Sequence, residues 1–161
     1  MNIIDPFCAV VASPFGAIGI RTEDDALTHI IYLPQGTQVQ APRNQLAAQA
    51  VKQLAHYFQH ADYALNLPLR CTGSAFQNKV WQAIAAIPVG QTQTYGALAK
   101  QIGSAARAVG QACGSNRLPL FIPCHRVVAA KGLGGFMRNN NAASDALQIK
   151  SWLLEHEGTR I

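Results

Sequence analysis

The spacing of apolar residues changes near residue 70, and this change constrains the fold more than any other feature of the sequence. Before it, short apolar runs alternate with turn-forming residues, and one longer segment has helical spacing. After it, apolar residues recur at helical spacing in short segments that end at glycine or proline. We therefore predict an α+β fold, with an α/β domain over residues 1–70 and a mostly helical domain over residues 73–161.

The N-terminal part predicts a β-meander followed by a helix. Strands are expected over residues 7–12, 17–21 and 26–33, because the intervening sequences SPFG and EDD favour turns. Residues 65–69 can return as a further strand. The helix is indicated by apolar residues that share one face, namely Leu46, Ala47, Ala50, Val51, Leu54 and Phe58.

The C-terminal part predicts several short helices. Ser74 and Gln77 have the spacing of a capping box, and the helix that follows them ends before Pro88. Two more helices are expected over residues 95–102 and 105–113. The short glycine-containing turn between them is typical of a helix-turn-helix, although an ordinary αα-hairpin would show the same spacing.

A buried strand and a final helix complete the predicted C-terminal domain. The apolar run over residues 118–128 resembles a strand, but Cys124, His125 and Arg126 interrupt its centre. Reactive polar groups inside a buried segment need a chemical explanation. The final helix is expected over residues 145–156.

Cysteine usage and hydropathy indicate an intracellular protein. The four cysteines are scattered and form no CxxC pair, so a disulfide scaffold is not expected and a reducing cytoplasmic setting fits best. Of the potential zinc ligands, only Cys124 and His125 lie close together, so we predict no metal site. No apolar run is long enough to span a membrane, and the first residues lack the pattern of a signal peptide.

Basic residues are concentrated in the second half of the chain. No Asp or Glu occurs from Tyr63 to Ser144, whereas eight basic residues do: Arg70, Lys79, Lys100, Arg107, Arg117, Arg126, Lys131 and Arg138. Such an asymmetry suits a protein that binds a polyanion, because Lys and Arg release counterions from phosphates. A solvated basic face without a partner would have the same composition.

Cys124 is the candidate nucleophile. A cysteine reacts as its thiolate, and a neighbouring imidazole or positive field favours that form. Adjacent side chains in a strand point to opposite faces, so contact between Cys124 and His125 needs a bend or a bridging water. Pro123 can provide the bend. A Cys-His dipeptide taken alone more often marks an inert buried cysteine than a reactive one.

The segment NRLPLFIPCHRVV, residues 116–128, resembles the active-site motif of the O6-alkylguanine-DNA alkyltransferases, the methylated-DNA protein-cysteine methyltransferases. TYGALAKQIG from Thr94, AARAVG from Ala105 and KSWLLEHEG from Lys150 are similar to further family segments, in family order. The resemblance implies a ribonuclease-H-like α/β domain followed by a helical domain with a winged-helix-like helix-turn-helix.

The resemblance also implies a role for each matching residue of the reaction centre. Cys124 would accept the alkyl group, His125 would take its proton through a bound water, and Glu157 would orient and charge the histidine. Asn116 matches the family's hinge asparagine, and Tyr95 matches the tyrosine that rotates the target phosphate and protonates the departing guanine. The product is a thioether, so the protein would act once, irreversibly and without a cofactor.

The implied partner is double-stranded DNA that contains O6-methylguanine or O4-methylthymine, bound through the minor groove by a monomer. Attack on the alkyl group at O6 requires the base to leave the stack. Arg107 matches the family's intercalating arginine. The small residues that would let its helix approach the groove are Ala105, Ala106, Ala108 and Gly110.

Two segments depart from the family pattern. The turn at residues 103–104 is shorter than in relatives, and the loop GGFMRNNNAAS replaces a sequence that usually has a tyrosine, a small residue and paired glycines. Phe136 takes the tyrosine position. We expect the substrate pocket to be lined by Val127, Val128, Phe136 and Met137.

Two other functions compete with alkyl transfer. Alkyltransferase-like proteins bind the same lesions without transferring the alkyl group, but they replace the reactive cysteine, commonly by tryptophan, whereas Cys124 is present here. A thiol hydrolase would need an oxyanion hole and a base that touches the nucleophile directly. The adjacent positions of Cys124 and His125 argue against that arrangement.

Overall fold

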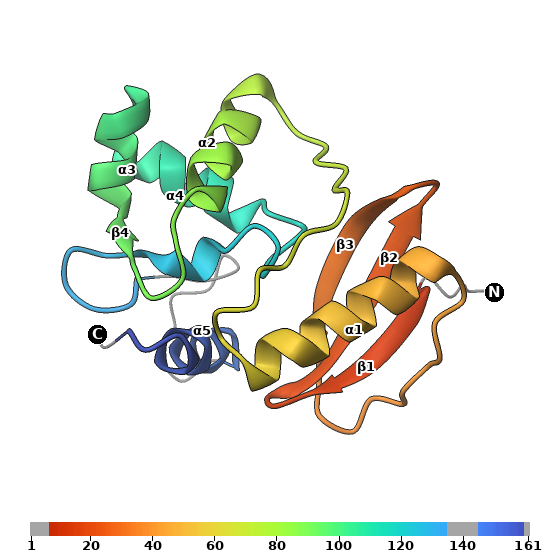
Figure 1. Ribbon diagram of the computed structural model, residues 1–161. Coiled ribbons are helices and arrows are strands. Elements are labelled where there is room, and N and C mark those ends of the chain that lie inside the picture. The colour runs from red at the N-terminus through yellow and green to blue at the C-terminus, as the bar shows by residue number, and fades with distance from the viewer. Residues whose placement is uncertain (1–6, 135–144, 160–161) are drawn as a thin grey trace. The chain divides into compact units, whose positions relative to one another are not determined.

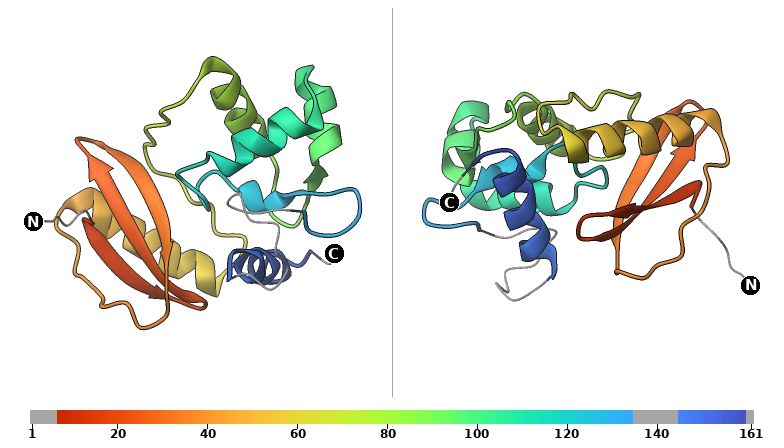
Figure 2. Two further views of the ribbon diagram at one scale, coloured as in Figure 1. Left: turned by 180° about the vertical axis from the view of Figure 1, so that it is seen from behind. Right: turned by 60° about the horizontal axis from the view of Figure 1, so that its bottom comes forward.

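The chain folds into two compact units, Met1–Cys71 and Thr72–Ile161, in a computed structural model that describes residues 7–134 and 145–159. The first unit is a small sheet with one helix, and the second is mostly helical (Figures 1 and 2). The α+β class expected from the sequence is confirmed. No helix in the described part of the chain has the length and apolar character needed to cross a membrane.

The first unit contains the predicted meander. Strands β1 (Ala9–Ser13), β2 (Gly16–Glu23) and β3 (Ala26–Leu33) form an antiparallel sheet in that order. Helix α1 (Gln45–Gln59) lies against this sheet (Figure 1). Three residues of the predicted face, Ala47, Ala50 and Leu54, are buried, and the other three are half-buried. Tyr57, which the apolar spacing did not include, is buried as well.

The predicted strand at residues 65–69 is absent. A single parallel bridge joins Leu27 to Leu69, supported by hydrogen bonds from Leu27 N to Pro68 O (2.9 Å) and from Arg70 N to Leu27 O (2.8 Å). Pro68 has no N–H, so it cannot donate to a continuing ladder. The segment is therefore extended at the edge of β3 without forming a strand.

The second unit begins with three helices whose ends were marked in the sequence. Helix α2 (Ala75–Ala85) starts at a complete capping box, in which Gln77 N donates to Ser74 Oγ and Ser74 N donates to Gln77 Oε1. Helix α3 (Tyr95–Ile102) ends at Gly103 with φ of 74°, a left-handed conformation that glycine adopts easily. Helix α4 (Ala106–Gly114) packs against both α2 and α3.

The segment 118–128 is not the continuous strand that its apolar residues predicted. Only β5 (Val127–Val128) is a strand, paired in parallel with β4 (Gln93–Thr94). Before it, Leu120 has φ of 76°, and Pro119 and Pro123 lack the N–H groups that a ladder requires. The apolar run reflects burial of an irregular segment, and this segment leads into the short 3-10 helix η1 (Cys124–Arg126).

Helix α5 (Asp145–His156) has the predicted bounds and contacts η1. Its buried side chains are Leu147, Ile149, Lys150, Leu153 and Leu154. Glu157 follows directly and is also buried. The second unit thus brings the end of α5 beside the turn that carries Cys124.

Candidate active site

The 3-10 turn η1 presents Cys124 and His125 together in the interior of the second unit. Cys124 is 3% exposed and His125 is 1% exposed. Successive side chains in a 3-10 helix are about 120° apart, in contrast to the opposite faces of a strand. The geometric obstacle expected for a strand is therefore absent, and Pro123, which caps η1 with ψ of 67°, lies at the bend.

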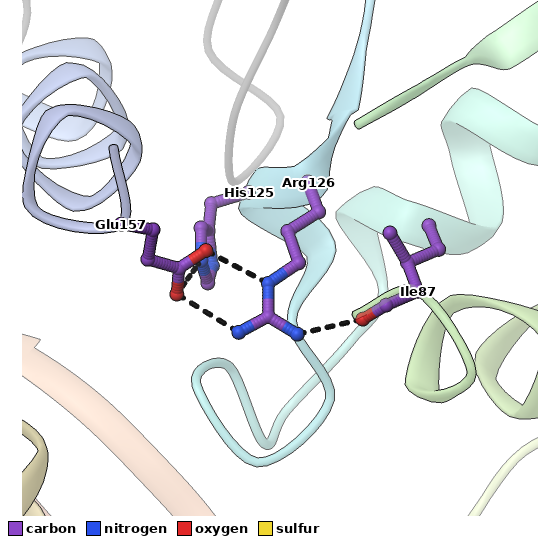
Figure 3. Close-up of polar contacts among 4 residues, drawn as sticks. All are labelled: Ile87, His125, Arg126 and Glu157. Carbon is purple, nitrogen blue, oxygen red and sulfur yellow. Dashed lines mark hydrogen bonds and ion pairs between the residues drawn. The ribbon is translucent and has the colours of Figure 1, made fainter. Parts of the chain in front are cut away.

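Glu157 is the hydrogen-bond partner of His125. The Nε2 atom of His125 lies 2.9 Å from Oε2 of Glu157 (Figure 3). An ionised carboxylate only accepts hydrogen bonds, so the ring proton resides on Nε2 and the Nδ1 atom is left with its lone pair. Nδ1 is buried and has no hydrogen-bond partner among the described residues.

Arg126 fixes the same carboxylate. Its Nε and Nη2 atoms donate to the two carboxylate oxygens of Glu157 at 2.8 and 2.9 Å, and its Nη1 atom donates to Ile87 O at 2.7 Å (Figure 3). This bidentate pair leaves the carboxylate little freedom to rotate. The sequence indicated Arg126 only as a positive charge near Cys124, whereas the structure makes it the anchor of Glu157.

Burial and charge act in opposite directions on His125. Burial lowers the pKa of the imidazole, and the hydrogen bond and negative charge of Glu157 raise it. The net shift is downward, so the resting histidine is neutral near pH 7 and able to accept a proton at Nδ1. Glu157 then stabilises the imidazolium that forms.

Burial and neighbouring groups also act in opposite directions on the pKa of the Cys124 thiol. Burial raises the pKa of the thiol, whereas a hydrogen bond from Asn116 and the positive charge of Lys150 lower it. The net shift is upward, so the resting side chain is a thiol. Formation of a thiolate therefore has to be coupled to removal of the proton by a base.

Asn116 connects the end of α4 to the segment that precedes Cys124. Its Nδ2 atom donates to Ile122 O at 2.9 Å, and Leu118 N donates to its Oδ1 atom at 2.9 Å. The residue is buried. These bonds fix the irregular chain that a regular strand ladder would otherwise have held.

Tyr95, the first residue of α3, lies next to two glycines. A Cβ atom at Gly134 would lie 2.9 Å from Cε2 of the tyrosine ring, and one at Gly110 would lie 3.9 Å from Cδ1. Gly134 also has φ of 74°. The close approach and the backbone conformation both require glycine at position 134.

The predicted DNA-facing residues occupy one end of α4. Ala105, Ala106 and Arg107 are exposed, whereas Ala108 and Gly110 are half-buried. The opposite face of the helix is buried through Val109, Ala112 and Cys113. Arg107 therefore lies on the outer face of the helix whose inner face contributes to the core.

The predicted pocket residues fall into two groups. Val127 and Val128 are buried in β5. Phe136 and Met137, like the whole unusual loop over residues 136–141, lie outside the described residues. In the described ranges, no three His, Cys, Asp or Glu side chains gather as they would around a metal ion.

Sequence reasoning missed Lys150. The side chain is completely buried, and its Nζ atom donates to Val127 O at 2.8 Å. The signal was present, because Lys150 lies three residues after Leu147 and four before Leu154, on the apolar face of the last helix. A lysine at a core position is rare enough to deserve a functional question.

Two family models match the chain. The model described as 6-O-methylguanine DNA methyltransferase, ribonuclease-like domain, matches residues 7–71. The model described as 6-O-methylguanine DNA methyltransferase, DNA binding domain, matches residues 75–159. The two matches together cover most of the chain.

Individual relatives agree with these models. The chain is 33% identical over 161 residues to the methylated-DNA-protein-cysteine methyltransferase of Methanosarcina acetivorans, covering 95% of this chain and 99% of that protein. It is 36% identical over 158 residues to the constitutive methyltransferase of that name from Bacillus subtilis, covering 90% and 91%. The crystal structure of Mycobacterium tuberculosis OGT in complex with DNA superposes with a TM-score of 0.76 at 34% identity, covering 92% and 91%.

Proposed function

Because the chain belongs to the 6-O-methylguanine DNA methyltransferase family, we propose that it repairs DNA by direct reversal, with Cys124 as the acceptor of the alkyl group from O6-alkylguanine. The observation that carries this proposal is the buried turn on which Cys124 adjoins the His125–Glu157 pair. That arrangement supplies a nucleophile, a base and a group that stabilises the charged base.

The reaction begins with proton transfer from the Cys124 thiol to Nδ1 of His125 through a water molecule. The thiolate attacks the alkyl carbon, a carbon-sulfur bond forms, and the bond from carbon to O6 breaks. The guanine leaves with the electron pair and takes a proton, which Tyr95 supplies. His125 and Glu157 cannot hydrolyse the resulting thioether, so each molecule acts once and no cofactor is needed.

The DNA is a duplex, bound in its minor groove by α3 and α4. Small residues at the start of α4 let the helix backbone approach the groove, and Arg107 occupies the space that the flipped base leaves. Exposed basic residues of the second unit, Lys100, Arg117 and Lys131, add phosphate attraction. Asn116 acts as the hinge between α4 and the cysteine turn.

The flipped base enters a pocket lined by Val127, Val128, Phe136 and Met137. O4-methylthymine is a second substrate, since it presents the same alkyl-oxygen bond. The protein works in the cytoplasm. It acts as a monomer, because a single copy contains both the helix pair that faces the DNA and the acceptor cysteine.

The proposal is tested by comparing two cysteine variants on duplex DNA that contains O6-methylguanine. Cys124→Ser removes the proposed acceptor, so no guanine should be restored, while binding to the damaged duplex persists. Cys113→Ala is the matched control, because Cys113 is the other buried cysteine of the second unit. Restored guanine is measured by nucleoside chromatography. Stoichiometric repair by Cys124→Ser would contradict the proposal.

A further inference from the structure

Lys150 is a charged side chain buried in the core of the second unit. It is 0% exposed, and its neighbours on the buried face of α5 are Leu147, Leu153 and Leu154. A buried ammonium loses its hydration and destabilises the fold unless other groups compensate. An apolar side chain would fill this position without the cost of burying a charge, so we expect the charge to have a function.

The ammonium is held in a defined place. Its Nζ atom donates to Val127 O at 2.8 Å and lies 5.8 Å from the centroid of the Tyr95 ring. Val127 immediately follows η1, and Tyr95 begins α3. The lysine therefore connects α5 to the backbone just after the cysteine turn and to the face of the tyrosine.

Two thiols lie within the range of this charge. Lys150 acts electrostatically on Cys124 of η1 and on Cys113 of α4. The other titratable groups near Cys124 interact with one another. His125 is hydrogen-bonded to Glu157, and Arg126 is hydrogen-bonded to the same carboxylate. The positive charge of Arg126 is thus matched by a carboxylate, whereas Lys150 acts on the sulfur atoms.

We propose that Lys150 is a positioning residue whose ammonium is the fixed countercharge for the Cys124 thiolate, held in place by the Val127 carbonyl and the Tyr95 ring. This inference rests on the proposed function, because it assigns a cause to the reactivity of the same sulfur. The thiol proton goes to His125, and Lys150 keeps all its protons throughout. It lowers the free energy of the anion without taking part in bond making.

Cys113 stays neutral in this scheme. Burial raises the pKa of its thiol to about 12, so it remains protonated when Cys124 ionises. Burial lowers the pKa of Lys150 to about 8, with the two thiols acting in the opposite direction, so the ammonium is still mostly protonated at pH 7. When Cys124 ionises, its thiolate and the Lys150 ammonium form a second pair of opposite charges in the unit, besides the Arg126–Glu157 pair.

The test measures how the reactivity of Cys124 depends on pH in three variants. Lys150→Met removes the charge and keeps a similar shape, Lys150→Arg keeps a charge, and Lys79→Met removes an exposed charge of the same unit as the control. Alkylation by iodoacetamide is followed on the Cys124 peptide by mass spectrometry from pH 6 to about 9. This reagent needs no DNA, so the outcome does not depend on repair activity.

Lys150→Met should slow Cys124 alkylation by about tenfold below pH 8, where the wild-type ammonium is charged, and the difference should shrink above pH 8 as that ammonium loses its proton. Lys150→Arg should recover part of the loss, and Lys79→Met should match the wild type. Slowing of Lys150→Met by the same factor at every pH would overturn the proposal, because packing alone would then explain the loss.

A second measurement uses the wild-type protein and remains decisive if Lys150→Met fails to fold. Isotope-labelled lysine side chains are titrated by NMR before and after methylation of Cys124 by methyl iodide. Cys124 raises the pKa of Lys150 and coupling between two ionisable groups is reciprocal, so removing the ionisable sulfur should lower the pKa of Lys150. An unchanged Lys150 titration would overturn the proposal. If methylation lowers the pKa of Lys150 as expected but the protein does not repair DNA, the result counts against the proposed function alone.

Discussion

Glu157 is the residue on which the proposed base depends, because one carboxylate serves two neighbouring side chains of η1. It receives the ring N–H of His125 and both donors of Arg126. Arg126 holds the carboxylate in place, and the negative charge of the carboxylate stabilises the imidazolium of His125. An amide at this position has one accepting oxygen and no charge, so it can satisfy neither neighbour fully.

Glu157→Gln should therefore slow methyl transfer from an O6-methylguanine duplex by about 100-fold, because the imidazolium formed during the reaction loses its countercharge. Single-turnover rates measure the effect. Glu155→Gln, which changes an exposed glutamate on α5 two residues earlier, is the control and should react like the wild type. Equal rates for both variants would show that the His125–Glu157 contact has no part in proton transfer.

At the level of single residues, the family resemblance named His125 and Glu157, and the structure places their side chains in hydrogen-bond contact. Their roles in the reaction stay predictions. The sequence motif did not predict Lys150, because a lysine in a helix sequence is normally read as solvent-exposed. Nor did it predict the double hydrogen bond of Arg126, since that contact joins segments 31 residues apart. Contacts of this kind depend on tertiary packing and leave no local signal.

At the level of elements, prediction succeeded where local chemistry marks the ends. The capping box at Ser74, the cap at Thr94 and the left-handed Gly103 each satisfy backbone groups near them in sequence. The prediction was wrong at residues 118–128, where most of the apolar run is an irregular segment and not a strand. Burial alone does not distinguish a strand from an irregular segment, and the two prolines were the neglected signal.

The proposed function assigns Arg107, an exposed residue of α4, to base flipping and not to the chemical step, so its substitution gives a test at this scale. Arg107→Ala should slow repair of the duplex by about 100-fold, because a few kcal/mol of unstacking is no longer offset. The reaction with free O6-benzylguanine, which needs no flipping, should change by less than about twofold. Arg117→Ala, another exposed arginine of the second unit, is the control.

Rates on both substrates are measured under single-turnover conditions. Equal slowing on duplex and free base would place Arg107 at the reaction centre and contradict its assignment to the DNA. Equal slowing of Arg107→Ala and Arg117→Ala on duplex alone would reduce both residues to general phosphate attraction.

For the whole molecule, the buried site makes stability depend on pH. The folded-state pKa of Lys150, about 8, lies below the ordinary value of 10.5. Between these values the unfolded chain binds more protons than the folded chain, so stability rises with pH. The lowered pKa of His125 acts in the same direction at lower pH, and its contribution is lost as pH falls below 6.5.

The free energy of unfolding from urea titrations should accordingly rise in the wild type relative to Lys150→Met by about 2 kcal/mol between pH 8 and about 9.5. The difference between wild type and Lys79→Met should stay constant over the same interval, because that lysine is exposed. A constant difference for Lys150→Met as well would mean that the buried lysine has an ordinary pKa.

The central claim is that Cys124 permanently accepts the alkyl group from DNA. The most direct measurement is the intact mass of the protein, followed by peptide mapping, after incubation with excess duplex that contains O6-methylguanine. Each active molecule should gain a single methyl group, located on the Cys124 peptide, and should repair no further DNA. An unchanged mass with continued repair, or a methyl group on Cys8, Cys71 or Cys113, would contradict the account.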